Sequence, residues 1–158
     1  MLLTELPLGL PGRVFAGPMP FSRYDPDGAV LDAVRAEGVS LVVVLAERDE
    51  CPVAGGRELF EHYRAAGLEV LHVPVRDFTA PDPAVLAPAV ARVLAHARAG
   101  GHAAVHCHAG RGRTGLFAAC LGRAALGLDG DDAIAWVRRL IPGAVETAAQ
   151  QALVRAWR

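Results

Sequence analysis

Short apolar runs and segments of helical periodicity alternate along this chain. The runs are rich in β-branched residues and are bounded by glycine or charged residues, a pattern typical of buried parallel strands. Three of them are Val39–Leu45, Leu68–Val73 and Ala103–His106, and Arg13–Ala16 could add a strand at the edge. The runs therefore predict a mostly parallel sheet of about four to five strands.

Helical patterns occupy the intervals between these runs. They cover Ala29–Glu37, Arg57–Ala66 and, before the last strand, a longer segment that ends near Ala97. Asp82 and Pro83 are residue types favoured at the N-cap and the first helical position, so they predict the start of the longer helix. Pro88 leaves a later start open, because an interior proline removes one backbone hydrogen bond.

After residue 107 the pattern is purely helical, and no further strand is predicted. Three helices are expected, over Thr114–Leu126, Asp131–Leu140 and about Thr147–Trp157. Strands that alternate with helices predict an α/β fold, here with helices flanking the sheet and a helical cluster at the C-terminal end. A length of 158 residues suits a single domain over 1–158 with a full core of its own.

The composition narrows the classes of partner. A formal net charge of -1 argues against broad affinity for nucleic acid or for a membrane surface. The N-terminal stretch MLLTELPLGLPGR lacks the features of a signal peptide, and no apolar run is long enough to span a membrane. Three cysteines without a C-x-x-C pair fit a reducing compartment. We expect a cytoplasmic protein without a cofactor, nucleic acid or membrane insertion; the oligomeric state stays open, with a monomer as the working expectation.

The stretch VHCHAGRGRTG, residues Val105–Gly115, holds two overlapping phosphate-handling patterns. Its three glycines match the G-x-G-x-x-G of a dinucleotide-binding turn, whereas Cys107 and Arg113 match the C-x5-R loop of a cysteine phosphatase. Both patterns predict a helix N-terminus that offers free N–H groups to an anion. A dinucleotide fold would continue into a strand with an acidic residue about 20 residues on. That interval is helical here, which favours the phosphatase.

A cysteine nucleophile requires positive charge or N–H donors nearby to stabilise its thiolate, because a free thiol with a pKa of about 8.5 is mostly protonated at neutral pH. Cys107 stands where a strand ends and a helix begins, beside successive backbone N–H groups and the guanidinium of Arg113. The guanidinium can bind two phosphate oxygens at once. The expected phosphate-binding loop comprises His108, Ala109, Gly110, Arg111, Gly112 and Arg113.

Nearly the whole chain resembles the small atypical dual-specificity phosphatases of the protein-tyrosine-phosphatase superfamily. The matching stretches are LPGRVFAGPMP, LVVVLAERDE, VPVRDFTAPD, VHCHAGRGRTG and IPGAVETAAQ, in the family's order and spacing. The extended H-C-x5-R-T-G after a strand is the most specific of them. The resemblance implies a cysteine-phosphatase fold. It also implies hydrolysis of phosphotyrosine, phosphoserine and phosphothreonine through a phosphocysteine intermediate.

The resemblance also implies catalytic roles for two residues besides the cysteine and the arginine. Asp77, in D-F-T-A-P, would protonate the departing oxygen and later activate water. Asp82 is the rival acid, although its place before a proline suits helix capping better. Thr114 would donate its hydroxyl to the sulfur of Cys107, and it could also cap the following helix.

Three further residues would support the site. His106 would orient the loop from behind, with a hydrogen-bonded strand histidine as the alternative. Gln150, in E-T-A-A-Q, would position the hydrolytic water, although it could equally be a solvated surface residue. Glu47, after the strand that begins at Val39, could brace Arg113 by a charge-assisted hydrogen bond.

Other interpretations use the same residues. His108 and Arg111 make the pocket mouth basic, so a phosphoinositide or inositol phosphate is the alternative to a phosphorylated protein as substrate. A metal site could be formed by His106, Cys107 and His108 with His102 and His72, but the positive charge of Arg113 would repel the cation. A sulfurtransferase usually has a shorter loop without R-T-G. A catalytically silent phosphopeptide-binding module usually lacks the cysteine, the arginine or the acid, and this chain has all three.

Overall fold

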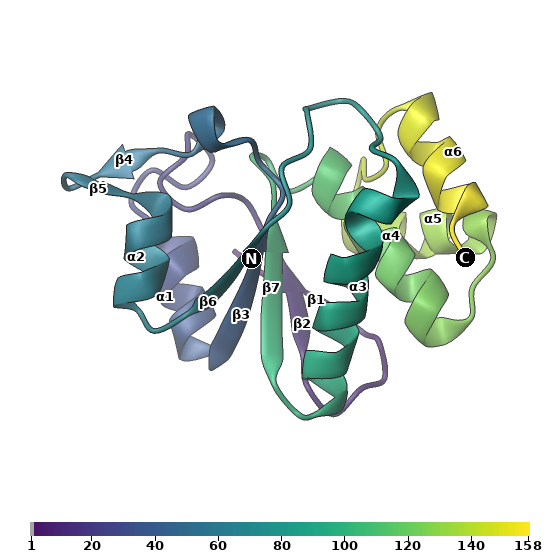
Figure 1. The fold of residues 1–158 in the computed structure, drawn as a ribbon, viewed down its shortest axis with the longest axis horizontal. Helices are drawn as coiled ribbons and strands as arrows, with labels where there is room; N and C mark the ends of the chain where they lie inside the picture. The colour runs from purple at the N-terminus through teal and green to yellow at the C-terminus, as the bar shows by residue number, and fades with distance from the viewer. Residues whose placement is uncertain (1) are drawn as a thin grey trace.

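A five-stranded sheet runs through the middle of the molecule (Figure 1). Its strands lie in the order β1 (Thr4–Leu6), β2 (Val14–Ala16), β7 (His102–His106), β3 (Val39–Val44) and β6 (Glu69–His72). Every neighbouring pair is parallel except β1 and β2, which are antiparallel. This computed structural model describes residues 2–158. The prediction of a mostly parallel sheet within an α/β fold is confirmed.

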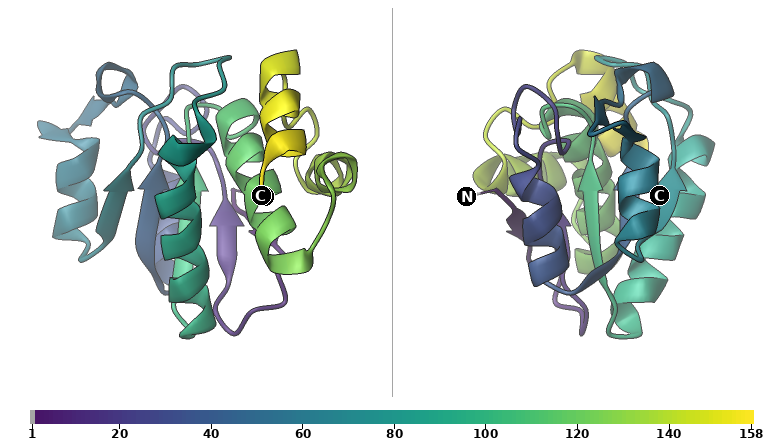
Figure 2. Two further views of the ribbon diagram at one scale, coloured as in Figure 1. Left: turned by 45° about the vertical axis from the view of Figure 1, so that its right-hand side comes forward. Right: turned by 90° about the vertical axis from the view of Figure 1, so that its left-hand side faces the viewer.

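Helices cover both faces of the sheet (Figure 2). The helices are α1 (Ala29–Ala36) and α2 (Leu59–Ala65) on one face, and α3 (Pro83–Arg98) and α4 (Gly112–Leu126) on the other, with α5 (Gly130–Leu140) and α6 (Ala148–Ala156) packed against α4. A short 3-10 turn, η1 (Arg48–Glu50), and a small hairpin of β4 (Val53–Ala54) and β5 (Arg57–Glu58) lie between β3 and α2.

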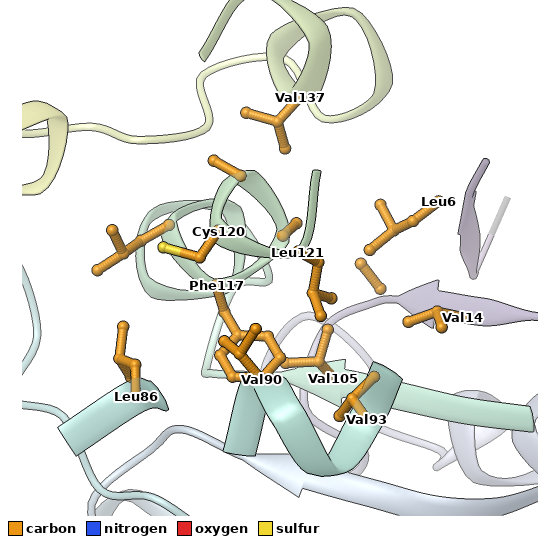
Figure 3. Close-up of a cluster of buried hydrophobic side chains, with 14 of the residues drawn as sticks. Leu6, Val14, Leu86, Val90, Val93, Val105, Phe117, Cys120, Leu121 and Val137 are labelled. Atoms are coloured by element: carbon orange, nitrogen blue, oxygen red, sulfur yellow. The ribbon is translucent and has the colours of Figure 1, made fainter. Parts of the chain in front are cut away.

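Alternate residues of the central strands belong to two separate cores. Leu41 and Val43 of β3 pack with α3 and α4, whereas Val42 and Val44 pack with α1 and α2. This alternation follows from the period of two in a strand. Figure 3 shows the first of these cores, around Phe117 of α4. The central strands are thus buried on both faces, which explains why they read as continuous apolar runs.

The prediction that the Arg13–Ala16 segment forms an edge strand is wrong in position. β2 lies inside the sheet, because β1 pairs with its outer side, from Thr4 opposite Ala16 to Leu6 opposite Val14. β1 has only three residues and only its last is buried, so it gives no alternating pattern that sequence reasoning could detect.

The long helix α3 begins at the earlier of its two possible starts. The side chain of Asp82 accepts a hydrogen bond from the backbone N–H of Ala84 at 2.9 Å, and Pro83 is the first helical residue. The helix then continues through Pro88, so its later start is excluded. The N-cap and the buried apolar face stabilise the helix enough to absorb one missing backbone hydrogen bond.

The loops that follow β2, β3, β6 and β7 meet at one end of the sheet, because the carboxyl ends of parallel strands share an edge. All of the predicted site residues lie in or beside these loops except Gln150, which comes from the first turn of α6.

In the part of the chain that the structure describes, no helix has the length and apolar character needed to cross a membrane.

Candidate active site

Cys107 lies directly after β7, at the start of the loop that leads into α4. Only 3% of its surface is exposed, and its sulfur accepts a hydrogen bond from the hydroxyl of Thr114 at 3.1 Å. A thiolate gains more from such a donor than a thiol does, because hydrogen bonds to charged groups are stronger. The structure therefore places the predicted hydroxyl donor at the sulfur.

The loop from Cys107 to Gly112 is held in a tight curve by its glycines. Gly110 has a φ of 81°, and a Cβ atom at this position would lie 2.6 Å from the carbonyl oxygen of Gly17. Any other residue here would be strained by the left-handed backbone conformation, and its side chain would clash with the backbone at Gly17. The curve ends at Gly112, where α4 begins and where the first N–H groups of the helix lack partners within the helix.

Arg113 is almost fully buried beneath this loop, with 1% of its side chain exposed. Both of its terminal nitrogens donate to the carboxylate of Glu50 at 2.8 Å, and one of them also donates to the carbonyl oxygen of Val75 at 2.8 Å. Its Nε is the one buried side-chain nitrogen or oxygen within residues 2–158 that has no hydrogen-bond partner. This atom lies 3.4 Å from an oxygen of Asp77 and is free to donate to a bound anion.

The bracing carboxylate is therefore Glu50, and the prediction of Glu47 is wrong. Glu47 instead forms the N-cap of η1, and its backbone N–H donates to Glu50 at 2.8 Å. The chain makes one 3-10 turn directly after Glu47. Glu50, at the end of this turn, is therefore the acid that faces Arg113. The E-x-x-E spacing of a reciprocal cap was the available sequence signal for this turn.

Replacing Glu50 by glutamine should lower both the stability and the activity of the protein. Arg113 would remain buried without its counter-charge, so we expect a loss of about 1–3 kcal/mol in the free energy of unfolding. Hydrogen bonds from Arg113 hold the pKa of Glu50 below its ordinary value of 4.5. This stabilisation is therefore complete above pH 4.5 and disappears as the pH falls through the lower folded pKa, so the difference from wild type should narrow there.

Urea denaturation between pH 3 and pH 7 measures this difference. Glu58→Gln is the matched control, because Glu58 pairs with Arg48 where both side chains are exposed. The control should change stability by less than about 0.5 kcal/mol. Equal effects of the two substitutions, or a difference that widens in acid, would contradict the role of Glu50.

His106, the last residue of β7, lies behind the loop in a buried hydrogen-bond chain, and its role in orienting the loop stays a prediction. Its Nδ1 lies 3.0 Å from the carbonyl oxygen of Cys107, and its Nε2 lies 2.6 Å from the hydroxyl of Tyr63. Because the carbonyl can only accept, Nδ1 carries the proton and Nε2 accepts from Tyr63. Burial lowers the pKa of His106 to about 4, so the ring stays neutral near pH 7. Sequence reasoning did not identify Tyr63, because a tyrosine on the buried face of a helix looks like an ordinary core residue.

Asp77 lies on the loop between β6 and α3, with 44% of its side chain exposed. One of its oxygens accepts from the backbone N–H of Phe78 at 2.9 Å and lies 3.4 Å from Nε of Arg113. Phe78 itself has a φ of 61°, which is unusual for a bulky residue and turns the loop sharply after the acid. Asp82, the rival acid, caps α3.

Gln150 is fully buried where the first turn of α6 meets the Asp77 loop. Its side-chain oxygen accepts from the backbone N–H groups of Glu146 and Thr147, at 2.8 and 3.3 Å. Its side-chain nitrogen donates to the carbonyl oxygen of Thr79 at 3.4 Å. The alternative of a solvated surface residue is excluded, while a role in positioning water stays a prediction.

These loops surround a cavity of about 290 Å³ with Cys107 in its wall. The lining comprises Arg23, Tyr24, Asp77, Phe78, Cys107, His108, Ala109, Arg111, Gly112, Arg113 and Glu146. Sequence reasoning predicted the members from the phosphate loop and the acid, but it missed Arg23, Tyr24, Phe78 and Glu146. Phe78 directly follows the predicted acid and Glu146 opens the E-T-A-A-Q stretch, but neither was assigned a role at the site. Arg23 and Tyr24 lie far from the other lining residues in the sequence and reach the cavity only through the fold. Within residues 2–158, no three histidine, cysteine or carboxylate side chains gather as metal ligands would.

A central parallel strand that leads into H-C-x5-R-T, with a buried arginine and a neighbouring acid, is the architecture of a cysteine phosphatase. The family model for the DSP-PTPase phosphatase of polymorphic toxin systems matches residues 21–124. The chain belongs to this family of dual-specificity and tyrosine phosphatases.

Individual relatives agree with this assignment. The bovine protein tyrosine phosphatase domain-containing protein 1 is 29% identical in an alignment of 136 residues that covers 81% of this chain and 17% of the bovine protein. The crystal structure of Tk-PTP in its active form is 32% identical, with a TM-score of 0.81 over 99% of this chain and 97% of that one. Kinase-associated phosphatase, in a form whose catalytic cysteine is replaced by serine, has the same fold at 21% identity. Its TM-score is 0.87, over 99% of this chain and 93% of that one.

Proposed function

We propose that this phosphatase acts on phosphorylated proteins, removing phosphate from tyrosine and also from serine and threonine, through a phosphocysteine on Cys107. The observation that carries the proposal is the convergence of three groups on one cavity: the sulfur of Cys107, the Nε of Arg113, which has no hydrogen-bond partner in the described residues, and the carboxyl group of Asp77. A phosphate monoester dianion fits there, with its oxygens on the arginine and on the first amides of α4.

In the first step, the Cys107 thiolate attacks phosphorus and forms an S–P bond while the bond from phosphorus to the ester oxygen breaks. Asp77 gives its proton to the departing oxygen, so that the leaving group departs as a neutral alcohol or phenol. In the second step, Asp77 takes a proton from water and the water oxygen attacks phosphorus. The S–P bond breaks, and its electron pair returns to the sulfur, where the hydroxyl of Thr114 stabilises the thiolate.

Two features support a protein substrate. The cavity is bounded by Tyr24 and Phe78, which are 41% and 61% exposed and offer apolar contact to the side chain that carries the phosphate. The bovine relative is named for a protein tyrosine phosphatase domain. Because the mechanism requires Cys107 as a free thiol, we also propose a reducing compartment, the cytoplasm.

A panel of substrates tests this function, with the Cys107→Ser variant as negative control. We expect kcat/KM for phosphotyrosine and phosphothreonine peptides to exceed the values for inositol phosphates and soluble phosphoinositides by about tenfold or more. The reverse order would assign the phosphoinositide alternative. Turnover of thiosulfate would indicate a sulfurtransferase, and phosphopeptide binding without phosphate release would indicate a binding module.

A further inference from the structure

The segment 17–28, between β2 and α1, is held in one conformation by hydrogen bonds at both of its ends and to the phosphate-binding loop. Asp25 is 4% exposed, and its two oxygens accept from the backbone N–H groups of Ala29 and Val30 at 3.0 and 2.9 Å. Phe21 adopts a left-handed φ of 65°. The backbone N–H of Met19 donates to the carbonyl oxygen of His108 at 3.0 Å, which ties the segment to the phosphate-binding loop. The segment is therefore fixed in position relative to the phosphate-binding loop.

This segment presents Arg23 and Tyr24 to the cavity. The guanidinium of Arg23 lies 4.9 Å from the centre of the Tyr24 ring and donates to the Tyr24 hydroxyl at 2.7 Å. The Tyr24 and His108 rings lie nearly perpendicular to each other, with 5.6 Å between their centroids. Stacking of this kind holds a long side chain in place, so less conformational entropy is lost when it binds a partner.

In the described part of the chain, the guanidinium of Arg23 has no ion-pair partner near the cavity and can therefore bind a negatively charged group of a ligand. Arg113 is already matched by Glu50, whereas no carboxylate lies within 4.0 Å of the guanidinium of Arg23 or of Arg111 among residues 2–158. Two carboxylates, those of Asp77 and Glu146, also line the cavity. The mouth therefore suits a ligand that brings one further negative charge beside the phosphate. A polyphosphate would place more negative charge close to both acids.

Resting on the function proposed above, we infer that Arg23 binds an acidic side chain next to the phosphorylated residue of a protein substrate. Arg111, on the phosphate-binding loop itself, adds positive charge to the same mouth. Arg23 is thus a specificity-determining residue that lies outside the H-C-x5-R-T motif. It selects phosphopeptides by a carboxylate that does not take part in the reaction.

Pairs of phosphopeptides that differ only by aspartate or asparagine beside the phosphorylated residue test this inference. Wild type should give a kcat/KM about five- to tenfold higher for the aspartate peptide, a ratio that falls as salt is raised. Arg23→Gln should bring the ratio to about 1, and Arg23→Glu should invert it. Arg98→Gln is the matched control, because Arg98 is exposed at the end of α3 remote from the cavity, and it should keep the wild-type ratio.

The outcomes separate this inference from the function on which it rests. Equal hydrolysis of both peptides by wild type, or a ratio that Arg23→Gln leaves intact, overturns the role of Arg23 and leaves the protein phosphatase in place. An inositol bisphosphate hydrolysed faster than the aspartate peptide, in an Arg23-dependent way, overturns the peptide as the source of the second charge. Hydrolysis of neither peptide overturns the proposed function and this inference together.

Discussion

The Cys107→Ser variant is expected to lose hydrolysis of every phosphate monoester, by on the order of 10⁴-fold or more in kcat. A serine hydroxyl ionises far less readily than a thiol, so the loop amides and Arg113 would surround a group that cannot attack phosphorus. The phosphate site would remain, because Arg113 is held by Glu50 and by Val75 independently of the sulfur. We therefore expect a phosphotyrosine peptide to bind this variant without being hydrolysed.

Steady-state kinetics and titration calorimetry measure these two effects. Cys51→Ser is the matched control, because burial raises the pKa of the Cys51 thiol to about 11 and this cysteine lies outside the cavity. Cys120 is similarly unreactive, since burial raises its pKa to about 12. Full activity in the Cys107→Ser variant, or loss of activity in the Cys51→Ser variant, would contradict the assignment of the nucleophile.

The Asp77→Asn variant should lose about 10²–10⁴-fold in kcat on phosphopeptides, the usual contribution of a general acid. The loss should be much smaller on p-nitrophenyl phosphate, because its leaving group departs without a proton. A plot of rate against leaving-group pKa should therefore be steeper for the variant than for wild type. This dependence separates proton donation from a merely structural role of the Asp77 loop.

Asp82→Asn serves as the control for this prediction. Asparagine caps a helix about as well as aspartate, so α3 should keep its first turn and the variant should keep its activity. A large loss in Asp82→Asn, together with near wild-type rates in Asp77→Asn, would transfer the role of general acid to Asp82.

The sequence predicted the catalytic loop because that chemistry is local. Cys107, Thr114 and Arg113 stand within eight consecutive residues, and one strand followed by one helix N-terminus is enough to bring them together. The buried strands were equally accessible, since burial on both faces leaves continuous β-branched runs. β1 was missed because three residues with one buried side chain carry no such pattern.

The parts of the site that depend on packing between distant segments could not be predicted. Glu50, and not the expected Glu47, binds Arg113, because a 3-10 turn follows Glu47 and brings Glu50 to the arginine. Tyr63 supports His106 across a separation of 43 residues, and Arg23 enters the cavity from the loop after β2. The E-x-x-E spacing indicates the 3-10 turn itself, but a single sequence does not show which distant residues Glu50, Tyr63 and Arg23 lie against, because each has an ordinary role available on its own element.

Trapping the covalent intermediate tests the central claim most directly. Wild-type protein would be mixed with a ³²P-labelled phosphotyrosine peptide, denatured within milliseconds and digested, and the labelled fragment would be identified by mass spectrometry. The mechanism predicts a phosphoryl group on the sulfur of Cys107, and no label in the Cys107→Ser variant. A label on another side chain, or rapid release of phosphate with no labelled protein at any time, would contradict the mechanism.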